Sequence, residues 1–130
     1  MRRLLDTNAY VALKRGNESV ARVLRESSEI VFSTIVLGEL LFGFRNGNRL
    51  AKNISELDAF LDDPRVGVLA VSRTTADRFG RIAAQLRRAG TPIPSNDIWI
   101  AAQTFESGAE LITFDDHFGA VAGLVWTRIS

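Results

Sequence analysis

The sequence predicts a three-layer α/β/α domain built on a central, mostly parallel sheet of five strands. Short apolar runs alternate along the chain with longer segments of helical periodicity, an order of elements typical of parallel α/β domains. The 130 residues are 46% hydrophobic and 24% charged, which is the average composition of one globular domain. We therefore expect a single domain over residues 1–130.

Five short segments, rich in Leu or in β-branched residues, predict the strands. They are residues 3–6, 30–33, 66–71, 110–113 and 124–129. Segments of helical length connect most of them, and parallel strands need such crossover connections. The sheet is therefore expected to be mostly parallel.

The segments between the strands predict helices. Apolar residues recur at helical spacing in residues 8–14, 17–26, 34–45, 53–61 and 72–89. Ser72 is the expected N-cap of the longest helix, and Gly90 its end. Two prolines keep residues 91–94 extended, so the next helix is expected to be capped by Ser95 or Asn96 and to run to about residue 107.

Composition excludes several kinds of active site. The chain has no cysteine, which rules out thiol nucleophiles, cysteine-bound zinc and disulfides. His117 is the single histidine, so a metal site with several histidines is impossible. The reactive groups that remain are mostly carboxylates.

Charge and hydropathy point to a cytoplasmic protein. The chain has 16 basic residues, 14 of them Arg, and 15 acidic ones, so its net charge alone does not indicate a polyanion binder and the distribution of charge must decide. Asp6 and Asn8 interrupt the apolar run at the N-terminus before a signal peptide can form. No apolar stretch reaches the roughly 18 to 20 residues that cross a bilayer, so no membrane association is expected.

Four carboxylates stand in unusual positions. Asp6 ends one predicted strand and Asp115 follows another, at the edge of a parallel sheet where ligands bind. Asp97 opens a helix, and Glu39 lies among aliphatic residues in the middle of another. Turn formation or the helix dipole explains each Asp taken alone. Glu39 must either reach the surface on a narrow polar stripe or be buried with a partner.

These four acids are widely separated in the chain, so only the tertiary fold can bring them together. In one cleft their repulsion would raise their pKa values, and a hard divalent cation such as Mg²⁺ or Mn²⁺ would relieve it. Such ions activate water for attack on phosphodiesters. Convergence of the acids would therefore indicate phosphodiester hydrolysis.

Four segments that contain these acids resemble the PIN-domain nucleases, and among them most of all the VapC toxins of type II toxin–antitoxin systems. The resemblance follows the family's order and spans essentially the whole chain. The segments are residues 4–8 (LLDTN), 34–40 (TIVLGEL), 96–102 (NDIWIAA) and 111–118 (LITFDDHF).

The resemblance implies a PIN-like fold and a metal-dependent endoribonuclease whose acidic quartet is Asp6, Glu39, Asp97 and Asp115. Asp6 and Asp97 would be the direct ligands of Mg²⁺ or Mn²⁺. Glu39 and Asp115 would hold metal-bound waters or a second ion.

Further residues would surround the quartet in such a nuclease. Thr113 matches the family's Thr-x-Asp hydroxyl, and Asn8, Thr34 and Asp116 are also candidates to support the acids. Capping and turn formation explain these residues equally well. His117, which precedes Phe118 as in the family's His-Phe pair, is expected to be a packed structural element rather than a base.

The resemblance also implies partners. These are an RNA substrate, structured RNA such as tRNA or rRNA being expected, a cognate antitoxin, and a second copy in a homodimer that forms a hetero-oligomer with the antitoxin. Five apolar residues on two consecutive predicted helices are expected to lie in the core or in a groove that the antitoxin covers: Phe42, Phe44, Leu57, Phe60 and Leu61.

Two other functions compete with the nuclease. A catalytically silent PIN-like module that only binds RNA or protein would be favoured by the loss of an acid, yet all four are present. A phosphohydrolase with an aspartate nucleophile needs a second Asp two residues after the first, and Asn8 stands there. The sequence therefore favours the ribonuclease toxin.

Overall fold

A sheet of five strands forms the centre of the protein, whose 130 residues are all described by a computed structural model. In sheet order the strands are β3 (Val66–Leu69), β2 (Glu29–Ser33), β1 (Arg2–Leu5), β4 (Glu110–Thr113) and β5 (Trp126–Arg128). Every neighbouring pair is parallel. The predicted sheet is confirmed, and it is wholly rather than mostly parallel.

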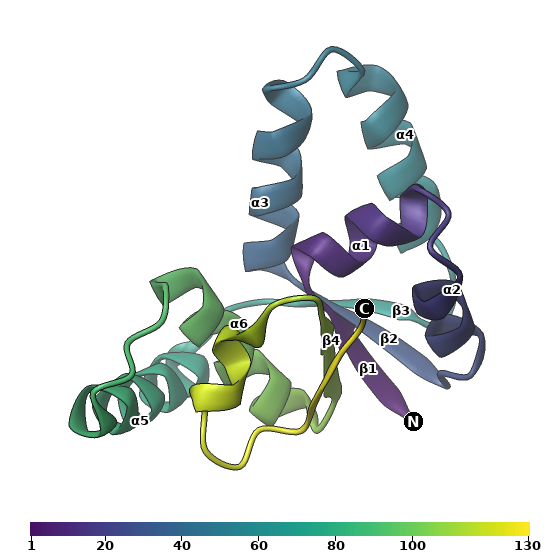
Figure 1. Cartoon of the computed structure of the whole chain (residues 1–130). Helices are drawn as coiled ribbons and strands as arrows, with labels where there is room; N and C mark the ends of the chain where they lie inside the picture. Colours follow the sequence, from purple (N-terminus) through teal and green to yellow (C-terminus); the bar gives the residue numbers. More distant parts are fainter.

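Six α-helices surround the sheet in two outer layers. They are α1 (Thr7–Lys14), α2 (Glu18–Arg25), α3 (Thr34–Arg45), α4 (Leu50–Leu61), α5 (Arg73–Ala89) and α6 (Ser95–Ser107). Figure 1 shows α5 and α6 on one side of the sheet and α1 and α2 on the other, while α3 and α4 rise from it as a helical arm. The three-layer prediction is confirmed. None of the helices combines the length and apolarity that crossing a membrane requires.

Local capping explains several helix ends. Ser72 caps α5 through a capping box with Thr75, and Gly90 ends the helix in the left-handed region at φ 70°, both as predicted. The start of α4 was predicted too late, because the helix already begins at Leu50.

The start of α6 differs from the prediction. Neither Ser95 nor Asn96 caps it. Instead the carbonyl oxygen of Pro94 accepts hydrogen bonds from the backbone N–H groups of Asp97 and Ile98, at 3.0 and 3.3 Å. Pro94 therefore occupies the N-cap position without a side-chain hydrogen bond, and the helix begins at Ser95, one residue or two before the predicted cap would place it.

An aromatic cluster packs the helical arm onto the sheet. Tyr10 of α1, Phe32 of β2 and Phe60 of α4 meet edge to face, with ring centroids 5.4 to 5.5 Å apart. Such contacts join elements that are distant in sequence, and they hold α1 and α4 in one orientation over the sheet.

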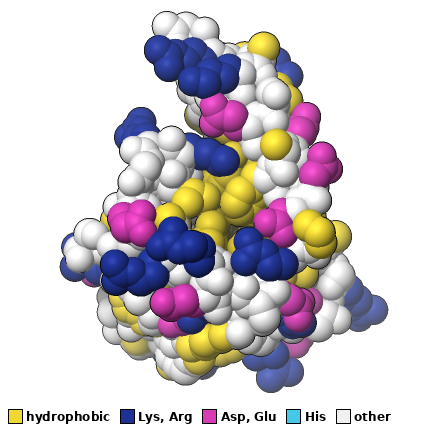
Figure 2. All heavy atoms as spheres, turned by 90° about the vertical axis from the view of Figure 1, so that its right-hand side faces the viewer, with side chains coloured by type: hydrophobic (Ala, Val, Ile, Leu, Met, Phe, Trp, Pro, Cys, Tyr) yellow, Lys and Arg dark blue, Asp and Glu magenta, His cyan; other side chains and the backbone are white.

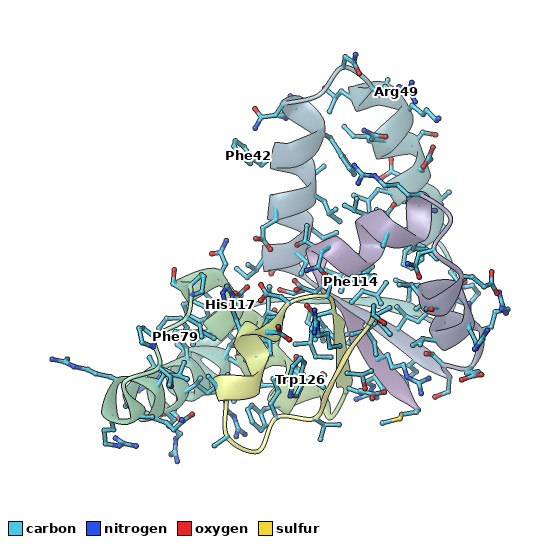
Figure 3. All side chains as sticks on the ribbon, viewed as in Figure 1. Phe42, Arg49, Phe79, Phe114, His117 and Trp126 are labelled. Atoms are coloured by element: carbon cyan, nitrogen blue, oxygen red, sulfur yellow. The ribbon has the colours of Figure 1, made fainter.

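The five apolar residues expected in a core or groove have different surroundings. Leu57 is buried, and Phe44, Phe60 and Leu61 are half-buried against the core. Phe42 is 67% exposed and points away from the arm (Figure 3). The helical periodicity of α3 explains this, because Phe42 follows the buried Leu40 by two positions and so lies on another face.

Strand order reverses beside β1. From β1 the chain proceeds to β2 and β3 on one side, and then crosses to β4 and β5 on the other. In parallel α/β sheets, the carboxyl ends of the strands at such a switch point form a crevice that binds ligands. The fold therefore places its ligand crevice beyond the ends of β1 and β4.

Candidate functional site

Asp6 lies at the carboxyl end of β1 and is tied to the end of β4. Leu5 pairs with Ile112, so Asp6 comes opposite Thr113. Its carboxylate accepts a hydrogen bond from the N–H of Thr7 at 2.8 Å, capping α1, and a second from Thr113 Oγ1 at 2.7 Å. The residue is only 5% exposed. Asp6 is thus held by both the strand register and the start of a helix.

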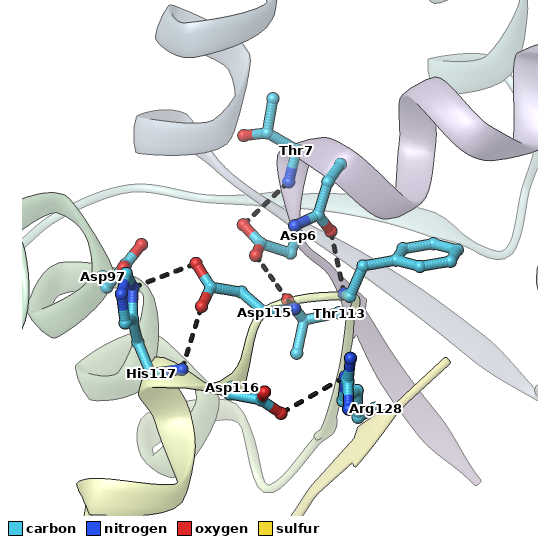
Figure 4. Close-up of polar contacts among 10 residues, drawn as sticks. Asp6, Thr7, Asp97, Thr113, Asp115, Asp116, His117 and Arg128 are labelled. Atoms are coloured by element: carbon cyan, nitrogen blue, oxygen red, sulfur yellow. Dashed lines mark hydrogen bonds and ion pairs between the residues drawn. The ribbon is translucent and has the colours of Figure 1, made fainter. Parts of the chain in front are cut away.

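Asp115 and Asp97 meet at a histidine. Asp115 caps a 3-10 helix, η1 (Asp116–Ala120), by accepting the N–H of His117 at 2.9 Å. The ring nitrogen Nδ1 of His117 lies 3.0 Å from Asp115 Oδ2 and 3.2 Å from Asp97 Oδ2 (Figure 4). A single histidine therefore joins the first turn of α6 to the segment after β4.

Glu39 reaches the same place from the arm. It accepts a hydrogen bond from Thr7 Oγ1 at 2.8 Å, which links α3 to the residue after Asp6. Asp6, Glu39, Asp97 and Asp115 all line one open cleft of about 740 Å³. The structure thus brings the four acids together. Of the two surroundings expected for Glu39, the structure shows a half-buried side chain with a hydrogen-bond partner rather than a side chain exposed on a polar stripe.

Burial and mutual repulsion raise the pKa values of two of the acids, Asp6 and Asp97. Burial raises the pKa of Asp6 from 3.8 to about 6, against the hydrogen bonds from Thr113 and Thr7, and the charges of Asp97 and Glu39 raise it further. Burial also raises the pKa of Asp97, with added repulsion from Asp115 and Glu39 and opposition from His117. The cleft concentrates negative charge that its own residues leave unbalanced.

The four residues expected to support the acids divide into two pairs. Thr113 donates to Asp6 and accepts the N–H of Asp115 at 3.0 Å. Asn8 accepts the N–H of Phe114 at 3.1 Å and so orients the segment between Thr113 and Asp115. Both lie where the pattern suggested, beside the quartet.

Thr34 and Asp116 do not contact the quartet. The hydroxyl of Thr34 donates to the carbonyl oxygen of Leu69 at 3.2 Å, so it joins α3 to the end of β3. The side chain of Asp116 is 74% exposed and points away from the quartet to pair with Arg128 of β5 at 3.2 Å (Figure 4). The turn into η1 sends the side chains of Asp115 and Asp116 in different directions, which two adjacent acids in a sequence cannot reveal.

Two polar residues of the site were not expected. The prediction that His117 is a packed element was wrong, since its side chain is 51% exposed and contacts two acids, while the neighbouring Phe118 is the buried member of the pair. Thr7 holds Glu39. The Asp-x-His spacing typical of a capped turn was a signal for His117, whereas Thr7 depends on how α3 packs.

The donor set of the cleft fits a divalent metal. Ligand atoms of Asp97, Asp115 and His117 all lie within 4.8 Å of one another. Burial, with added repulsion from neighbouring acids, raises the pKa values of Asp6 and Asp97, and a bound cation would favour their ionised forms. Carboxylate oxygens with one imidazole suit hard or borderline divalent ions. The cluster is therefore compatible with a metal site.

Removing the Thr113 hydroxyl tests this geometry. In Thr113→Val we expect the pKa of Asp6 to rise above about 6, because a hydrogen bond to its ionised form is lost. Stability at neutral pH should fall by about 1 to 3 kcal/mol, since the N–H of Asp115 also loses its acceptor. NMR titration of the Asp6 carboxyl and denaturant unfolding would measure both effects. An unchanged Asp6 titration would contradict the assignment, and Thr34→Val is the control outside the cluster.

Comparison with known proteins identifies the family. A model of the PIN domain matches residues 3–124, which is nearly the whole chain. The chain belongs to the PIN domain family. Its five-stranded parallel sheet with acids at the carboxyl ends of β1 and β4 is thus a PIN fold.

Relatives of this PIN domain narrow the family further. It is 32% identical to Ribonuclease VapC2 of Haemophilus influenzae over 85% of this chain and 83% of that one. It is 30% identical to the tRNA(fMet)-specific endonuclease VapC of Salmonella typhimurium, over 85% and 83% of the two chains. These identities place the PIN domain in the VapC ribonuclease toxin family.

Solved structures agree with the fold. The crystal structure of VapBC2 from Rickettsia felis bound to a DNA fragment from their promoter contains a chain that superposes with a TM-score of 0.88, at 27% identity and full coverage of both chains. A chain of the VapBC-1 structure from nontypeable Haemophilus influenzae superposes with a TM-score of 0.86, at 27% identity and with 98% of both chains covered.

Proposed function

We propose that this PIN domain is a metal-dependent endoribonuclease that hydrolyses RNA phosphodiester bonds as the toxin of a toxin–antitoxin pair. One observation carries the proposal. Four carboxylates from four separate segments converge on one cleft at the switch point of the sheet, and His117 contacts two of them. A folded protein keeps unbalanced like charges together at a cost to its stability, so the cluster indicates a function.

We assign Asp6 and Asp97 as direct ligands of Mg²⁺ or Mn²⁺, with Glu39 and Asp115 around them. Bound there, the ion would lower the pKa of a water molecule and stabilise negative charge on the scissile phosphate. Thr113 and the start of α1 hold Asp6 in place, and the Thr7 hydroxyl holds Glu39.

His117 arranges the other half of the site. With a proton on Nδ1 it donates to Asp97 and Asp115 and keeps these two carboxylates at one place. Asp115 is further fixed through its cap on η1, and Asn8 fixes the backbone before it. The protein thus orients all four of its acids by hydrogen bonds that do not use up all of their lone pairs.

We further propose structured RNA such as tRNA or rRNA as the substrate and a cognate antitoxin as the partner. The relative from Salmonella typhimurium is named for tRNA(fMet), and the matched structures from Rickettsia felis and Haemophilus influenzae are VapBC assemblies. A homodimer that joins the antitoxin, a single functional domain over residues 1–130 and a cytoplasmic location belong to the same proposal.

The rival function, a PIN-like module that binds RNA or protein without cleaving, lacks a supporting observation. All four acids face the cleft, and the hydrogen bonds described above maintain them there. A module without catalysis has no use for acids whose pKa values are raised by burial and by their mutual repulsion.

The experiment is cleavage of a panel of transfer, ribosomal and messenger RNAs by protein free of antitoxin. We expect discrete cuts with Mg²⁺ or Mn²⁺ and none with a chelator, because the acids by themselves offer no activated water. Gel mapping of the products would name the target. Binding of RNA without cleavage under every metal would contradict the nuclease and support the binding module.

A further inference from the structure

A second cleft opens directly from the acidic one. It measures about 500 Å³ and lies between α1, α3 and α4, under the helical arm. Thr7, Val11, Arg15 and Glu39 line both clefts, so the two form one continuous depression. In Figure 2 this side of the molecule is hollowed below the arm, and basic and acidic side chains stand around the apolar ones in the hollow.

The wall of the second cleft is rich in positive charge. Lys14, Arg15, Arg49 and Lys52 line it, against only Glu39 and Glu56. Glu39 already takes part in the acidic quartet through Thr7, and Glu56 lies 3.8 Å from Lys52. The cleft is therefore basic in a protein whose overall charge is only +1.

Three of these cations form no ion pair. Lys14 lies over the rings of Tyr10 and Phe60, with Nζ 5.7 and 5.5 Å from their centroids, and no carboxylate approaches it within 4.0 Å. Arg15 and Arg49 form no hydrogen bond through their guanidinium groups. Of the twelve other arginines, six are paired with acids and six on other surfaces are not; the paired ones are Arg2, Arg3, Arg25, Arg65, Arg81 and Arg128. The cleft thus presents charges that its own residues do not neutralise.

We propose that this cleft is a phosphate-binding subsite that holds the RNA backbone on one side of the scissile bond. The inference rests on the proposed nuclease function and adds the path of the strand. Arg15, at the junction, would contact the first phosphate beyond the acids, and Lys14, Arg49 and Lys52 would contact those that follow under the arm. Free cations on a groove that continues from the cleavage site suit a chain with one negative charge per nucleotide.

An acidic peptide segment is the other ligand that fits the charge. We favour RNA because the basic cleft is continuous with the proposed cleavage site, so a strand that is cut must leave it along an adjoining surface. The face of α5 gives no such continuity, although it also carries arginines.

The test measures RNA affinity by fluorescence anisotropy in the inactive Asp97→Asn background. The probe is a short labelled single-stranded RNA, and the variant pair Lys14→Gln and Arg49→Gln is compared with the pair Arg87→Gln and Arg88→Gln on α5. Both pairs remove two exposed charges. We expect the cleft pair to weaken binding about tenfold. Each phosphate contact on single-stranded RNA contributes about 0.7 to the slope of log K, the binding constant, against log salt concentration. Loss of two contacts should therefore make this slope shallower by about 1.4. The α5 pair should leave both unchanged.

Each outcome separates the subsite from the nuclease. Equal affinities and salt slopes for the two pairs, with RNA cleavage intact in the wild type, would overturn only the subsite. Loss of antitoxin binding by the cleft pair without loss of RNA binding would assign the cleft to a peptide and also overturn it. No cleavage by the wild type would remove the proposed function itself. Thermal unfolding of both pairs shows that each variant is folded.

Discussion

Asp97→Asn is expected to abolish metal-dependent RNA cleavage, with a loss of about a thousandfold or more. The substitution keeps the size of the side chain but removes a charge that several kcal/mol of metal-based transition-state stabilisation would depend on. Asp97 is the acid that α6 contributes to the cleft, and His117 holds its carboxylate beside Asp115. No other residue of the helix can replace it there.

The same substitution is expected to stabilise the metal-free protein at neutral pH. Burial and the charges of Asp115 and Glu39 raise the pKa of Asp97, so its ionised form is less stable in the folded protein than in the unfolded chain. The neutral amide of the variant has no charge to bury. Denaturant unfolding with a chelator would show a higher midpoint for the variant, and RNA cleavage would be measured on the same preparation.

Asp116→Asn is the matched control. Asp116 is also an acid near η1, but it is exposed and pairs with Arg128 outside the cleft. We expect the Asp116→Asn variant to cleave RNA at a rate near that of the wild type. Loss of a surface ion pair lowers the stability of the fold by at most about 1 kcal/mol. Activity retained in Asp97→Asn, or lost equally in both variants, would contradict the proposed site.

The metal-free protein is expected to lose stability as pH rises toward neutrality. The folded pKa of Asp6 is about 6, against an ordinary value of 3.8, so between these values the folded state binds a proton that the unfolded chain has released. Neutral Asp6 therefore favours folding at low pH, and this contribution is lost as pH rises through about 6. The full difference is about 3 kcal/mol, and Asp97 acts in the same direction.

Unfolding by urea at a series of pH values with a chelator would measure this effect. From about pH 5 to about pH 7.5 the free energy of unfolding should fall by more than about 1 kcal/mol. The acids with lowered pKa values, Glu18 and Asp63, change charge below this range and do not interfere. Asp6→Asn should flatten the profile. If the free energy of unfolding of the wild type varied with pH as little as that of the variant, ionised Asp6 would not destabilise the folded protein.

Added Mg²⁺ or Mn²⁺ should reverse the slope. Metal ligands must be deprotonated to bind, so stabilisation by the ion grows as Asp6 and Asp97 ionise. The gain from metal should therefore be largest above about pH 6, where the metal-free protein is weakest. Equal stabilisation at about pH 5 and about pH 7.5 would place the ion away from these two acids.

Local patterns in the chain predicted the elements and the four acids. Apolar periodicity, the Ser72 cap and the Gly90 stop act over a few residues, and each was confirmed at its position. The acids stood out because a carboxylate after a buried strand, or amid aliphatic residues as Glu39 is, has few ordinary explanations. The resemblance to PIN nucleases, which the family comparison confirmed, rested on the same short segments.

The sequence singled out Thr113 as a support for the acids, but the contacts that hold each acid in place depend on the tertiary fold. Thr113 reaches Asp6 across 107 positions, because the register of β1 against β4 brings their ends together. His117 meets Asp97 only because η1 turns toward the first turn of α6, and the same turn carries Asp116 away.

The order of residues was thus enough to predict which elements form, in what order, and which carboxylates are out of place, since short-range sterics, capping and side-chain polarity decide these features. That the Thr7 hydroxyl holds Glu39 and that the His117 ring contacts Asp97 and Asp115 became visible in the folded chain alone. Those contacts depend on strand register and on the angle at which each helix leaves the sheet, and both are set by packing across the whole core.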